Sequence, residues 1–579
     1  MRANFVFRVR IIALAIFLIA TVLLVRLYFV QVVAGDDWRL KAESQYVSQS
    51  TNRIDRGAIF FTPRRGLPIS AATVESGYTV AINPVTIADP QKAYDILKKY
   101  FPELDNADFL AHATKNGNSR TAIARQASEE VGQGIIAESL PGIEVSRERW
   151  RFYPGGSLAA HAIGFLGYAD DGVTITGRYG LERFYSDTLS KSDGGLYVNF
   201  FADLFTNIRS QLTNEDAQPG ADLVTSIEPS VQQYLEGLLE AYESEWSPRI
   251  DGGIVMDPKT GAILAMAARP TFNLNDFKNE DANSFSNPLV ESIFEFGSTM
   301  KPLTIAAGLD SGAITPDTEY DDKGYVIYDG ARVENYDGKG RGRVSMQEVL
   351  NQSLNTGIAF AVNRMGTNTL RDYFEKYGLT EETGIDLPSE ARPLVTNLKS
   401  PRTIEYVTAG FGQGIAVTPI AMARALATLA NDGAVPSPHI GVKLDYGGGI
   451  TKKLGWSPER QAISPQSAET VTRMLVEVVD TALRGGTVKI PEYAIAAKTG
   501  TAQIARPDVR GYYDDRYLHS FFGYFPAYDP QFLVFLFAAE PKGARYASET
   551  WTAPFMEMVR FLITYYDVPP DRALPSGRQ

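Results

Sequence analysis

The sequence contains no cysteine, which excludes disulfide bonds, thiolate metal sites and a thiol nucleophile. Only four histidines are present, at positions 112, 161, 439 and 519, and they lie far apart without the spacing of metal ligands. We therefore expect no metal and no other cofactor. The formal net charge of -12 argues against nucleic acid as a partner, because phosphate binding requires a basic surface. A nucleophilic mechanism in this chain must use a base other than a cysteine-histidine pair.

The bulk composition is that of a globular protein with several cores. Hydrophobic residues make up 44% of the chain and charged residues 21%, and no low-complexity tract is present. A length of 579 residues exceeds what one core supports, and the usual domain size predicts roughly three or four units.

The N-terminus has the pattern of a membrane anchor. Residues 1–10 carry three arginines and no acid, and residues 11–30 are apolar apart from one threonine and one arginine. As a helix this stretch is about 30 Å long, enough to cross a bilayer. The positive-inside rule then places the rest of the chain outside the cytoplasm. A cleaved signal peptide is the alternative, because the uninterrupted part at 11–25 is short, but we favour an uncleaved anchor at 11–33.

Ser298 and Lys301 form the most informative pair in the sequence, since no other serine has a lysine three residues later. A serine hydroxyl becomes a useful nucleophile only when a base lies within hydrogen-bond reach. Positions three apart in a helix share a face, so these two side chains are expected to point the same way. Pro302 fits a helix that begins close by. Ser298 is then expected at a helix N-terminus, where the backbone dipole favours developing negative charge.

Two further motifs follow along the chain. Ser353-Leu354-Asn355 comes after a helix predicted to open with the capping box Ser345-Met346-Gln347-Glu348. Lys498-Thr499-Gly500-Thr501 follows the apolar run 495–497, which predicts a strand. Another Lys-Thr-Gly, at 259–261, lies between two apolar runs and is interpreted as a β-hairpin turn.

Taken together, these three motifs resemble the set found in β-lactamases and penicillin-binding proteins. Over nearly its whole length the chain resembles a class B penicillin-binding protein, a peptidoglycan D,D-transpeptidase of septal or side-wall synthesis. We expect an α+β fold, with a penicillin-binding/β-lactamase-like transpeptidase domain on an extended α/β pedestal (dimerisation-type) domain and one N-terminal transmembrane helix. The predicted organisation is a cytoplasmic tail at 1–10, the anchor at 11–33, the non-catalytic pedestal at 34–245, the transpeptidase domain at 246–568 and a tail, expected to be disordered, at 569–579.

Local signals add several elements to this outline. We expect a strand near 220–227, helices at 229–245 and 553–566, strands at 520–525 and 531–539, and a helix that begins after Thr418 and ends at Gly433. Gly410-Phe411-Gly412-Gln413-Gly414 resembles a family marker, and we interpret its glycines as allowing close backbone packing. Arg56-Gly57-Ala58-Ile59 and Gly180-Leu181-Glu182 resemble patches of the family's pedestal, where turn geometry is the favoured interpretation.

The chemistry that these residues permit starts from Lys301 as an unprotonated base for Ser298. Lowering a lysine pKa from 10.4 to about 7 costs roughly 4 to 5 kcal/mol, which burial and a nearby cation, Lys498, can supply. Ser353 is expected to relay a proton to the departing D-alanine, because a hydroxyl both donates and accepts. Asn355 is expected to hold the substrate backbone or to orient Lys301.

The resemblance also implies how the substrate is bound. The backbone N–H groups of Ser298 and Thr501 resemble the family's oxyanion hole. The Lys498-Thr499-Gly500-Thr501 segment offers a positive charge and hydroxyls to the terminal carboxylate of the peptide. The resulting assignment names Ser298, Lys301, Ser353, Asn355 and Lys498 as catalytic and Thr499, Gly500 and Thr501 as substrate-binding.

The expected function is cross-linking of stem peptides through a serine acyl-enzyme, with β-lactams as inhibitors and the catalytic domain on the outer side of the bacterial inner membrane. Nothing before residue 245 predicts a glycosyltransferase site, so by resemblance the partners are a SEDS-type glycosyltransferase and division or elongation proteins. Length and the absence of an evident appended module favour the septal pathway. Two alternatives stay open: a membrane-bound β-lactam sensor or β-lactamase on the same fold, and a non-catalytic assembly scaffold.

Overall fold

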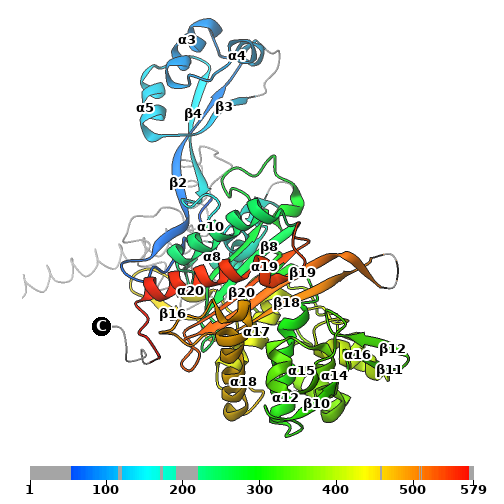
Figure 1. The fold of residues 1–579 in the computed structure, drawn as a ribbon. Helices are drawn as coiled ribbons and strands as arrows, with labels where there is room; N and C mark the ends of the chain where they lie inside the picture. The colour runs from blue at the N-terminus through cyan, green and yellow to red at the C-terminus, as the bar shows by residue number, and fades with distance from the viewer. Residues whose placement is uncertain are drawn as a thin grey trace, which may run out of the picture. The chain divides into compact units, whose positions relative to one another are not determined.

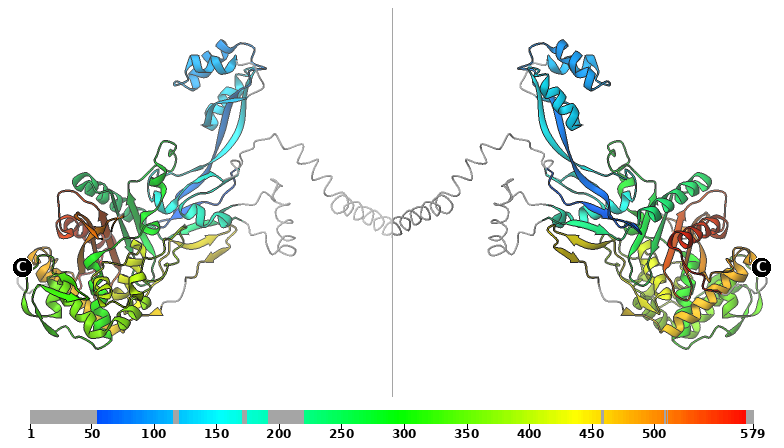
Figure 2. Two further views of the ribbon diagram at one scale, coloured as in Figure 1. Left: turned by 90° about the vertical axis from the view of Figure 1, so that its right-hand side faces the viewer. Right: turned by 90° about the vertical axis from the view of Figure 1, so that its left-hand side faces the viewer.

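The structure is a computed structural model that describes residues 54–114, 120–169, 174–190, 220–456, 460–507, 509 and 511–572. The predicted cytoplasmic tail at 1–10 and the predicted anchor at 11–33 lie outside these residues. No helix within the described ranges is long and apolar enough to span a bilayer. The chain forms two compact units, one holding Glu75–Trp150 and the other Asp55–Val74 together with Arg151–Gln579 (Figures 1 and 2).

The first unit is a small three-stranded sheet with helices. Strands β3 (Thr121–Ala127) and β4 (Ile143–Phe152) both pair with β2 (Ile69–Ile82), which continues into the second unit. Helices α3 (Pro90–Tyr100), α4 (Asn106–Ala113) and α5 (Glu129–Ala137) begin at side-chain caps, namely Asp89, Asp105 and Ser128. A cluster of buried aliphatic and aromatic side chains fills the space between sheet and helices: Val80, Ile82, Leu97, Phe109 and Ile135.

The centre of the second unit is an antiparallel five-stranded sheet. Its order is β18 (Ala496–Ala505), β19 (Tyr512–Phe525), β20 (Phe532–Ala539), β8 (Ile250–Met256) and β9 (Ile263–Arg269). All eight residues of β20 are buried, because helices cover both faces of this central strand. The predicted strands at 520–525 and 531–539 are confirmed, although β19 begins earlier. The Lys-Thr-Gly at 259–261 lies in the turn of the β8–β9 hairpin, as predicted.

Two long helices pack together on one face of this sheet (Figure 1). Helix α10 (Pro229–Trp246) is capped by Glu228, whose carboxylate accepts from the N–H of Val231 over 2.7 Å, and α20 (Thr552–Tyr566) lies beside it. Both helices match the predicted ones. Although α10 precedes the predicted domain boundary at 245/246, its Leu235 and Leu239 belong to the same core as strand residues of β20.

The opposite face is covered by a mainly helical layer that carries the motifs. It contains α12 (Lys301–Asp310), α13 (Met346–Asn351), α14 (Asn355–Met365), α15 (Thr367–Lys376), α16 (Thr403–Gly410), α17 (Pro419–Ala427) and α18 (Pro465–Glu477). Thr418 caps α17, as predicted, and accepts from the N–H of Ala421 over 3.2 Å. The predicted end at Gly433 is wrong: α17 ends at Ala427 and passes into a 3-10 turn at Thr428–Ala430, and Gly433 takes its left-handed conformation only after that turn.

The sheet that contains β2 has seven strands, and in the second unit β2 pairs antiparallel with β1 (Ile59–Phe61). This part of the sheet joins segments from both sides of the predicted domain boundary. Strand β7 (Asp222–Thr225) pairs in parallel with β1 and antiparallel with β15 (Gly441–Asp445), which is followed by β16 (Thr451–Lys453). The predicted strand near 220–227 is thus confirmed. The remaining elements are short: β5 (Leu166–Tyr168), β6 (Ile175–Gly177), α6 (Ala160–Ile163), α7 (Gly180–Phe184), α8 (Ser186–Leu189), α11 (Pro288–Glu291), β10 (Glu319–Asp322), β11 (Tyr325–Tyr328), β12 (Ala331–Glu334), β13 (Gly342–Ser345), β14 (Ala434–Val435), β17 (Arg460–Gln461) and α19 (Ala547–Thr550).

The pedestal patches singled out in the sequence have a structural role. The buried carboxylate of Glu182 accepts from the Nε atoms of Arg56 and Arg151, each over 2.6 Å. Gly57 lies so close to the strand region before β7 that a Cβ would stand 2.0 Å from the carbonyl oxygen of Ala221. Two arginines thus balance one buried acid, and a glycine lets two backbones approach.

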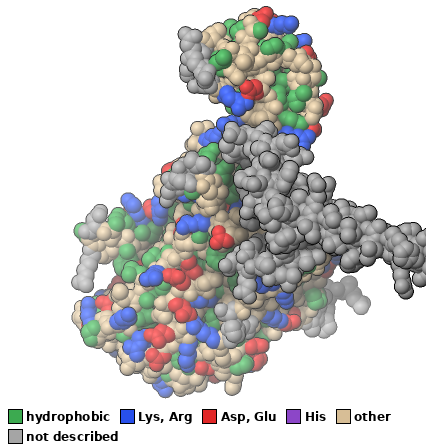
Figure 3. Space-filling model, turned by 180° about the vertical axis from the view of Figure 1, so that it is seen from behind, with side chains coloured by type: hydrophobic (Ala, Val, Ile, Leu, Met, Phe, Trp, Pro, Cys, Tyr) green, Lys and Arg blue, Asp and Glu red, His purple; other side chains and the backbone are tan. Residues whose placement is uncertain are grey.

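The expected tail is held in place through Arg572, so the predicted disorder from residue 569 is wrong for its first four residues. The carboxylate of Asp571 accepts from the N–H of Ala494 over 2.7 Å, and Arg572 pairs with Asp480 over 2.9 Å. Residues 573–579 lie outside the described part. On the face drawn in Figure 3, acidic and basic side chains are interspersed over the described surface.

Candidate active site

Ser298 lies in a tight turn directly before a helix. The 3-10 turn Gly297–Met300 carries the serine, and α12 begins at Lys301 with Pro302 in its first turn. The predicted helix start next to the serine is confirmed, but the serine itself sits in 3-10 geometry. Its neighbours Gly297 and Thr299 are buried, whereas Ser298 is partly exposed to the cavity described below.

Three glycines allow this turn to pack against two other backbones. Gly297 donates its N–H to the carbonyl oxygen of Gly412 over 3.0 Å, and a Cβ on Gly412 would stand 2.2 Å from the oxygen of Gly297. A Cβ on Gly500 would stand 2.5 Å from the oxygen of Phe296. The predicted close-packing role of Gly412 is confirmed. Gly500, predicted to bind substrate, faces the serine-bearing turn and not the cavity.

Lys301 is fully buried beneath the cavity. Its Nζ donates to the carbonyl oxygen of Ser353 over 2.6 Å and to the Oγ of the same residue over 3.2 Å. Burial, and secondarily the charge of Lys498, lowers the pKa of Lys301 well below its usual value. The direction of this shift and both of its causes were predicted from the sequence.

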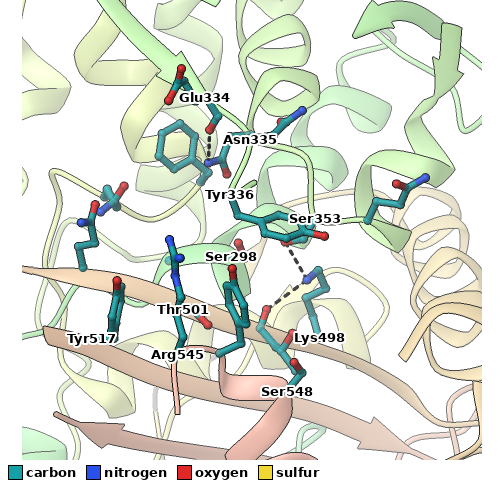
Figure 4. A pocket seen from close by; sticks show the side chains of 18 of the residues that line it. Ser298, Glu334, Asn335, Tyr336, Ser353, Lys498, Thr501, Tyr517, Arg545 and Ser548 are labelled. Carbon is teal, nitrogen blue, oxygen red and sulfur yellow. Dashed lines mark hydrogen bonds between the residues drawn. The ribbon is translucent and has the colours of Figure 1, made fainter. Parts of the chain in front are cut away.

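Lys498 approaches Ser353 from the sheet. It lies on β18, is 4% exposed, and donates to the Oγ of Ser353 over 3.1 Å and to the carbonyl oxygen of Thr499 over 3.2 Å. Burial lowers the pKa of Lys498 to about 8, so this lysine is largely charged at neutral pH. The Ser353 hydroxyl therefore lies within hydrogen-bond distance of two buried amines. Figure 4 shows the contact with Lys498.

The link between α13 and α14 places Ser353 at this point. Ser353 has a left-handed backbone, with φ +55°, which is uncommon for a residue with a side chain and must be held by its surroundings. Before it, the N–H of Glu348 donates to the cap Ser345, which is one half of the predicted capping box. The other half is not formed, because the Glu348 carboxylate accepts from the amides of Asn351 and Gln352. After it, the buried hydroxyl of Thr356 donates to the carboxylate of Asp322 over 2.8 Å.

Asn355 lines the cavity from the start of α14. Its amide Nδ2 donates to the carbonyl oxygen of Glu334 over 2.8 Å. Of the two roles expected for this residue, orientation of Lys301 finds no support, because the Lys301 amine is held by Ser353.

These groups surround one cavity of about 870 Å³, within the size range of small-molecule sites. Six predicted residues line it: Ser298, Ser353, Asn355, Lys498, Thr499 and Thr501. The hydroxyl of Thr501 accepts from the N–H of Ala547 over 3.0 Å, which leaves its own hydrogen free to donate into the cavity. No group of acids and histidines in the described residues could hold a metal ion.

Sequence reasoning missed the outer wall of the cavity. That wall includes Tyr336, Gln413, Tyr517, Arg545 and Tyr546. Tyr336 and Tyr546 meet edge to face with ring centroids 5.8 Å apart, although 210 positions separate them in the sequence. Isolated tyrosines and arginines between short elements carry no local pattern. Only Gln413, inside the predicted glycine-rich marker, had a signal that could have identified it.

Two family models match the chain, and both describe penicillin-binding proteins. The profile of the penicillin binding protein transpeptidase domain matches residues 252–559, and that of the penicillin-binding protein dimerisation domain matches residues 56–225. Stage V sporulation protein D of Bacillus subtilis is 29% identical over 566 residues, covering 96% of this chain and 85% of the relative. Peptidoglycan D,D-transpeptidase FtsI of Escherichia coli is 26% identical over 593 residues, covering 99% and 94%.

Solved structures show the same architecture. Penicillin binding protein 2X from Streptococcus thermophilus superposes with a TM-score of 0.71 at 20% identity, covering 89% of this chain and 80% of the other, which bears on the fold alone. Penicillin binding protein 3 from Mycobacterium tuberculosis, in complex with ampicillin, has a TM-score of 0.65 at 26% identity and covers 74% and 92%.

Proposed function

The chain belongs to the family of penicillin-binding protein transpeptidases, and we propose that it cross-links peptidoglycan stem peptides through an acyl-enzyme on Ser298. The observation that carries this proposal is the position of the Ser353 hydroxyl, 3.2 Å from the amine of Lys301 and 3.1 Å from that of Lys498. One amine is a base made neutral by burial, and the other is a cation. Between them the serine hydroxyl can pass a proton in either direction.

Acylation begins at Ser298. Its hydroxyl proton moves to the neutral Nζ of Lys301 while Oγ attacks the carbonyl carbon of the penultimate D-alanine. The tetrahedral oxyanion is stabilised by the backbone N–H groups of Ser298 and Thr501. The proton then passes from Lys301 through Ser353 to the departing amine. The C–N bond breaks, D-alanine leaves, and an ester joins Ser298 to the donor peptide.

Substrate is held along β18. The ammonium of Lys498 and the hydroxyls of Thr499 and Thr501 bind the terminal carboxylate, because all three residues line the cavity. Gly500 contributes through the packing of the strand on the serine turn. Asn355 accepts from the peptide backbone through Oδ1.

Deacylation transfers the donor to an amine. The acceptor nitrogen of a neighbouring stem peptide attacks the ester carbonyl, loses a proton to Lys301 through Ser353, and forms the cross-linking amide as Ser298 regains its hydrogen. β-Lactams acylate the same serine and act as inhibitors. The relative crystallised with ampicillin supports this assignment.

Residues 11–33 are proposed as a single-pass anchor in the bacterial inner membrane, with the transpeptidase domain on the outer side. The proposed domain limits are those expected from the sequence, with the pedestal at 34–245 and the transpeptidase domain at 246–568. A SEDS-type glycosyltransferase and division proteins are the proposed partners, and septal synthesis is the pathway that the resemblance favours. The Escherichia coli relative named FtsI, similar over 99% of this chain, supports a role in cell-wall synthesis.

Labelling of the full chain with a fluorescent penicillin, followed by peptide mapping, tests this function. The adduct is expected on Ser298 and should persist, and Ser298→Ala should abolish it. Ser311→Ala is the matched control, because the Ser311 hydroxyl donates to the carbonyl oxygen of Gly308, away from the cavity. An adduct on another residue would contradict the assignment. Rapid loss of the label with hydrolysed penicillin would instead identify a β-lactamase.

A further inference from the structure

The cavity carries an excess of positive charge that one terminal carboxylate does not balance. Arg332, Arg484, Lys498 and Arg545 line it, and among the described residues of its lining Glu334 is the one acid. Glu334 forms an ion pair with Arg332. Three cations therefore remain in the cavity of a protein whose net charge is -12. Such a focused field attracts anionic ligands.

Two of these three cations already have partners or a proposed role. Lys498 faces the terminal carboxylate of the substrate. Arg484 is held by backbone carbonyls, donating from Nε to Ser548 over 3.1 Å and more weakly to Glu549 over 3.4 Å. Arg545 differs from both. Its side chain is exposed, lies along the ring of Tyr546 at 5.4 Å, and forms no ion pair within the described part of the chain.

The backbone of Arg545 is fixed to the two strands that carry the site. The Nε2 of His519, on β19, donates to the carbonyl oxygen of Arg545 over 3.0 Å. Burial lowers the pKa of His519 to about 4, so this ring is neutral and the hydrogen bond is maintained at physiological pH. The carboxylate of Glu549 accepts from the N–H of Arg545 over 3.2 Å. Since His519 pairs with Thr501 across the sheet, Arg545 has a defined position relative to the reacting centre.

The order of residues on β18 gives the direction in which the donor peptide extends. In the proposed binding mode Lys498, Thr499 and the Thr501 hydroxyl hold the terminal carboxylate, and the Thr501 N–H lies at the scissile carbonyl. Gln503 lies two residues further along β18. Gln503 pairs with Tyr517, and both line the cavity. In Figure 4 Arg545 lies beside Thr501, and Tyr517 lies further from Lys498. A peptide that extends along the strand by about 3.3 Å per residue therefore brings the residue before D-alanyl-D-alanine to Arg545.

We propose that Arg545 binds a second carboxylate of the donor, carried on the side chain of the residue that precedes D-alanyl-D-alanine. This inference rests on the proposed function and adds the chemistry of the substrate. A guanidinium binds a carboxylate through two parallel hydrogen bonds, which an amide or an ammonium at the same place does not form. Arg545 thus selects donors whose third residue from the C-terminus keeps a free acid.

Binding to the unreactive Ser298→Ala full chain tests this selection by calorimetry. The probes are two N-acylated peptides ending in D-alanyl-D-alanine, which differ only in a carboxylate or a carboxamide on the preceding side chain. The carboxylate peptide should bind at least about tenfold more tightly, as expected for a charge-assisted pair. Adding Arg545→Ala should remove this preference, and Arg545→Lys should keep part of it. Arg332→Ala, which removes an arginine already paired with Glu334, should leave the preference unchanged.

Equal binding of the two peptides, or a preference that survives Arg545→Ala, would overturn the proposal. Failure of the wild-type chain to label on Ser298 would refute the proposed function, while the binding comparison would still report on Arg545.

Discussion

The amine of Lys301 donates to the carbonyl oxygen of Ser353 over 2.6 Å, and the left-handed backbone of Ser353 presents that oxygen. A backbone carbonyl accepts a hydrogen from a neutral amine as well as from a charged one, so this contact orients the amine in both protonation states. The lone pair of the neutral amine then remains available for a proton from Ser298. The Ser353 turn thus determines the position of the Lys301 amine, and burial determines its basicity.

Replacing Lys301 tests whether a neutral amine is required. Lys301→Arg places a permanent charge at this position, because a guanidinium does not deprotonate in proteins, so the second-order rate of acylation by penicillin should fall by about 10²- to 10⁴-fold. The acylation rate should fall by a similar factor in Lys301→Met, which removes the amine without adding bulk. Stopped-flow acylation measures both, with the exposed Lys323→Arg as control. A Lys301→Arg variant that acylates at near wild-type rate would exclude the base role.

The pH profile of acylation should have two limbs. The rate should increase with pH as Lys301 loses its proton, at a pH well below the usual lysine value, because its pKa is lowered. It should decrease above about pH 8, where Lys498 loses its charge. The two lysines interact, so the limbs report on the pair. In Lys498→Arg the cation persists, and the alkaline limb should move to higher pH. If the alkaline limb is unchanged in Lys498→Arg, the titration of a group other than Lys498 causes that limb.

The sequence was sufficient to predict the parts of the site that lie on regular elements. Ser298 and Lys301 were related by helical spacing, and Lys498 followed an apolar run that became β18. The motif predicts substrate binding for Gly500, whereas Gly500 packs against the serine-bearing turn. A sequence motif gives the residue type at a position but not the neighbour that the residue contacts. The wall formed by Tyr336 and Tyr546 depends on contacts between distant turns. Such contacts have no periodic signal along the chain.

Segment ends were also harder to predict than segment identities. The helix after Thr418 was expected to run to Gly433, since glycine commonly ends helices, but buried packing tightens it into a 3-10 turn after Ala427. The tail was expected to be disordered from residue 569, yet Asp571 and Arg572 find partners in the folded domain. Both differences arise from tertiary contacts that local composition does not encode.

Asp251 should make the stability of the protein depend on pH. Its carboxylate is buried, has no hydrogen-bond partner among the described residues, and burial raises its pKa to about 8. The folded state therefore holds this proton more tightly than the unfolded chain, whose pKa is about 4. The contribution is complete below about pH 4 and is lost as pH increases toward 8, at up to about 1.4 kcal/mol per pH unit.

Asp251→Asn should reduce this dependence. Urea unfolding at pH 5 and pH 8 gives the free energy of unfolding of each variant, and the difference between the two pH values should be smaller in Asp251→Asn than in the wild type. The exposed Asp317→Asn is the control and should keep the wild-type difference. An identical pH difference in Asp251→Asn and the wild type would mean that the buried carboxylate titrates normally.

Gly412 should position the nucleophile without touching substrate. Its left-handed backbone, φ +83°, brings it against Gly297, where a Cβ would stand 2.2 Å from the carbonyl oxygen. Gly312 has a similar backbone, φ +71°, but no atom lies within 4 Å of an added Cβ. Alanine at either site costs about 1 to 2 kcal/mol for the left-handed conformation, so the pair separates backbone strain from displacement of the serine turn.

We expect Gly412→Ala to slow penicillin acylation by about 10- to 100-fold, because a shift of about 1 Å in a reacting group can cost a factor of 10². Gly312→Ala should acylate at the wild-type rate despite a comparable loss of stability. The experiment measures the acylation rates of both folded variants and uses thermal unfolding to check their stability. Equal acylation rates in the two variants would show that the contact between Gly412 and Gly297 has no effect on the position of Ser298. A loss confined to Gly412→Ala would locate the constraint on the nucleophile in that contact.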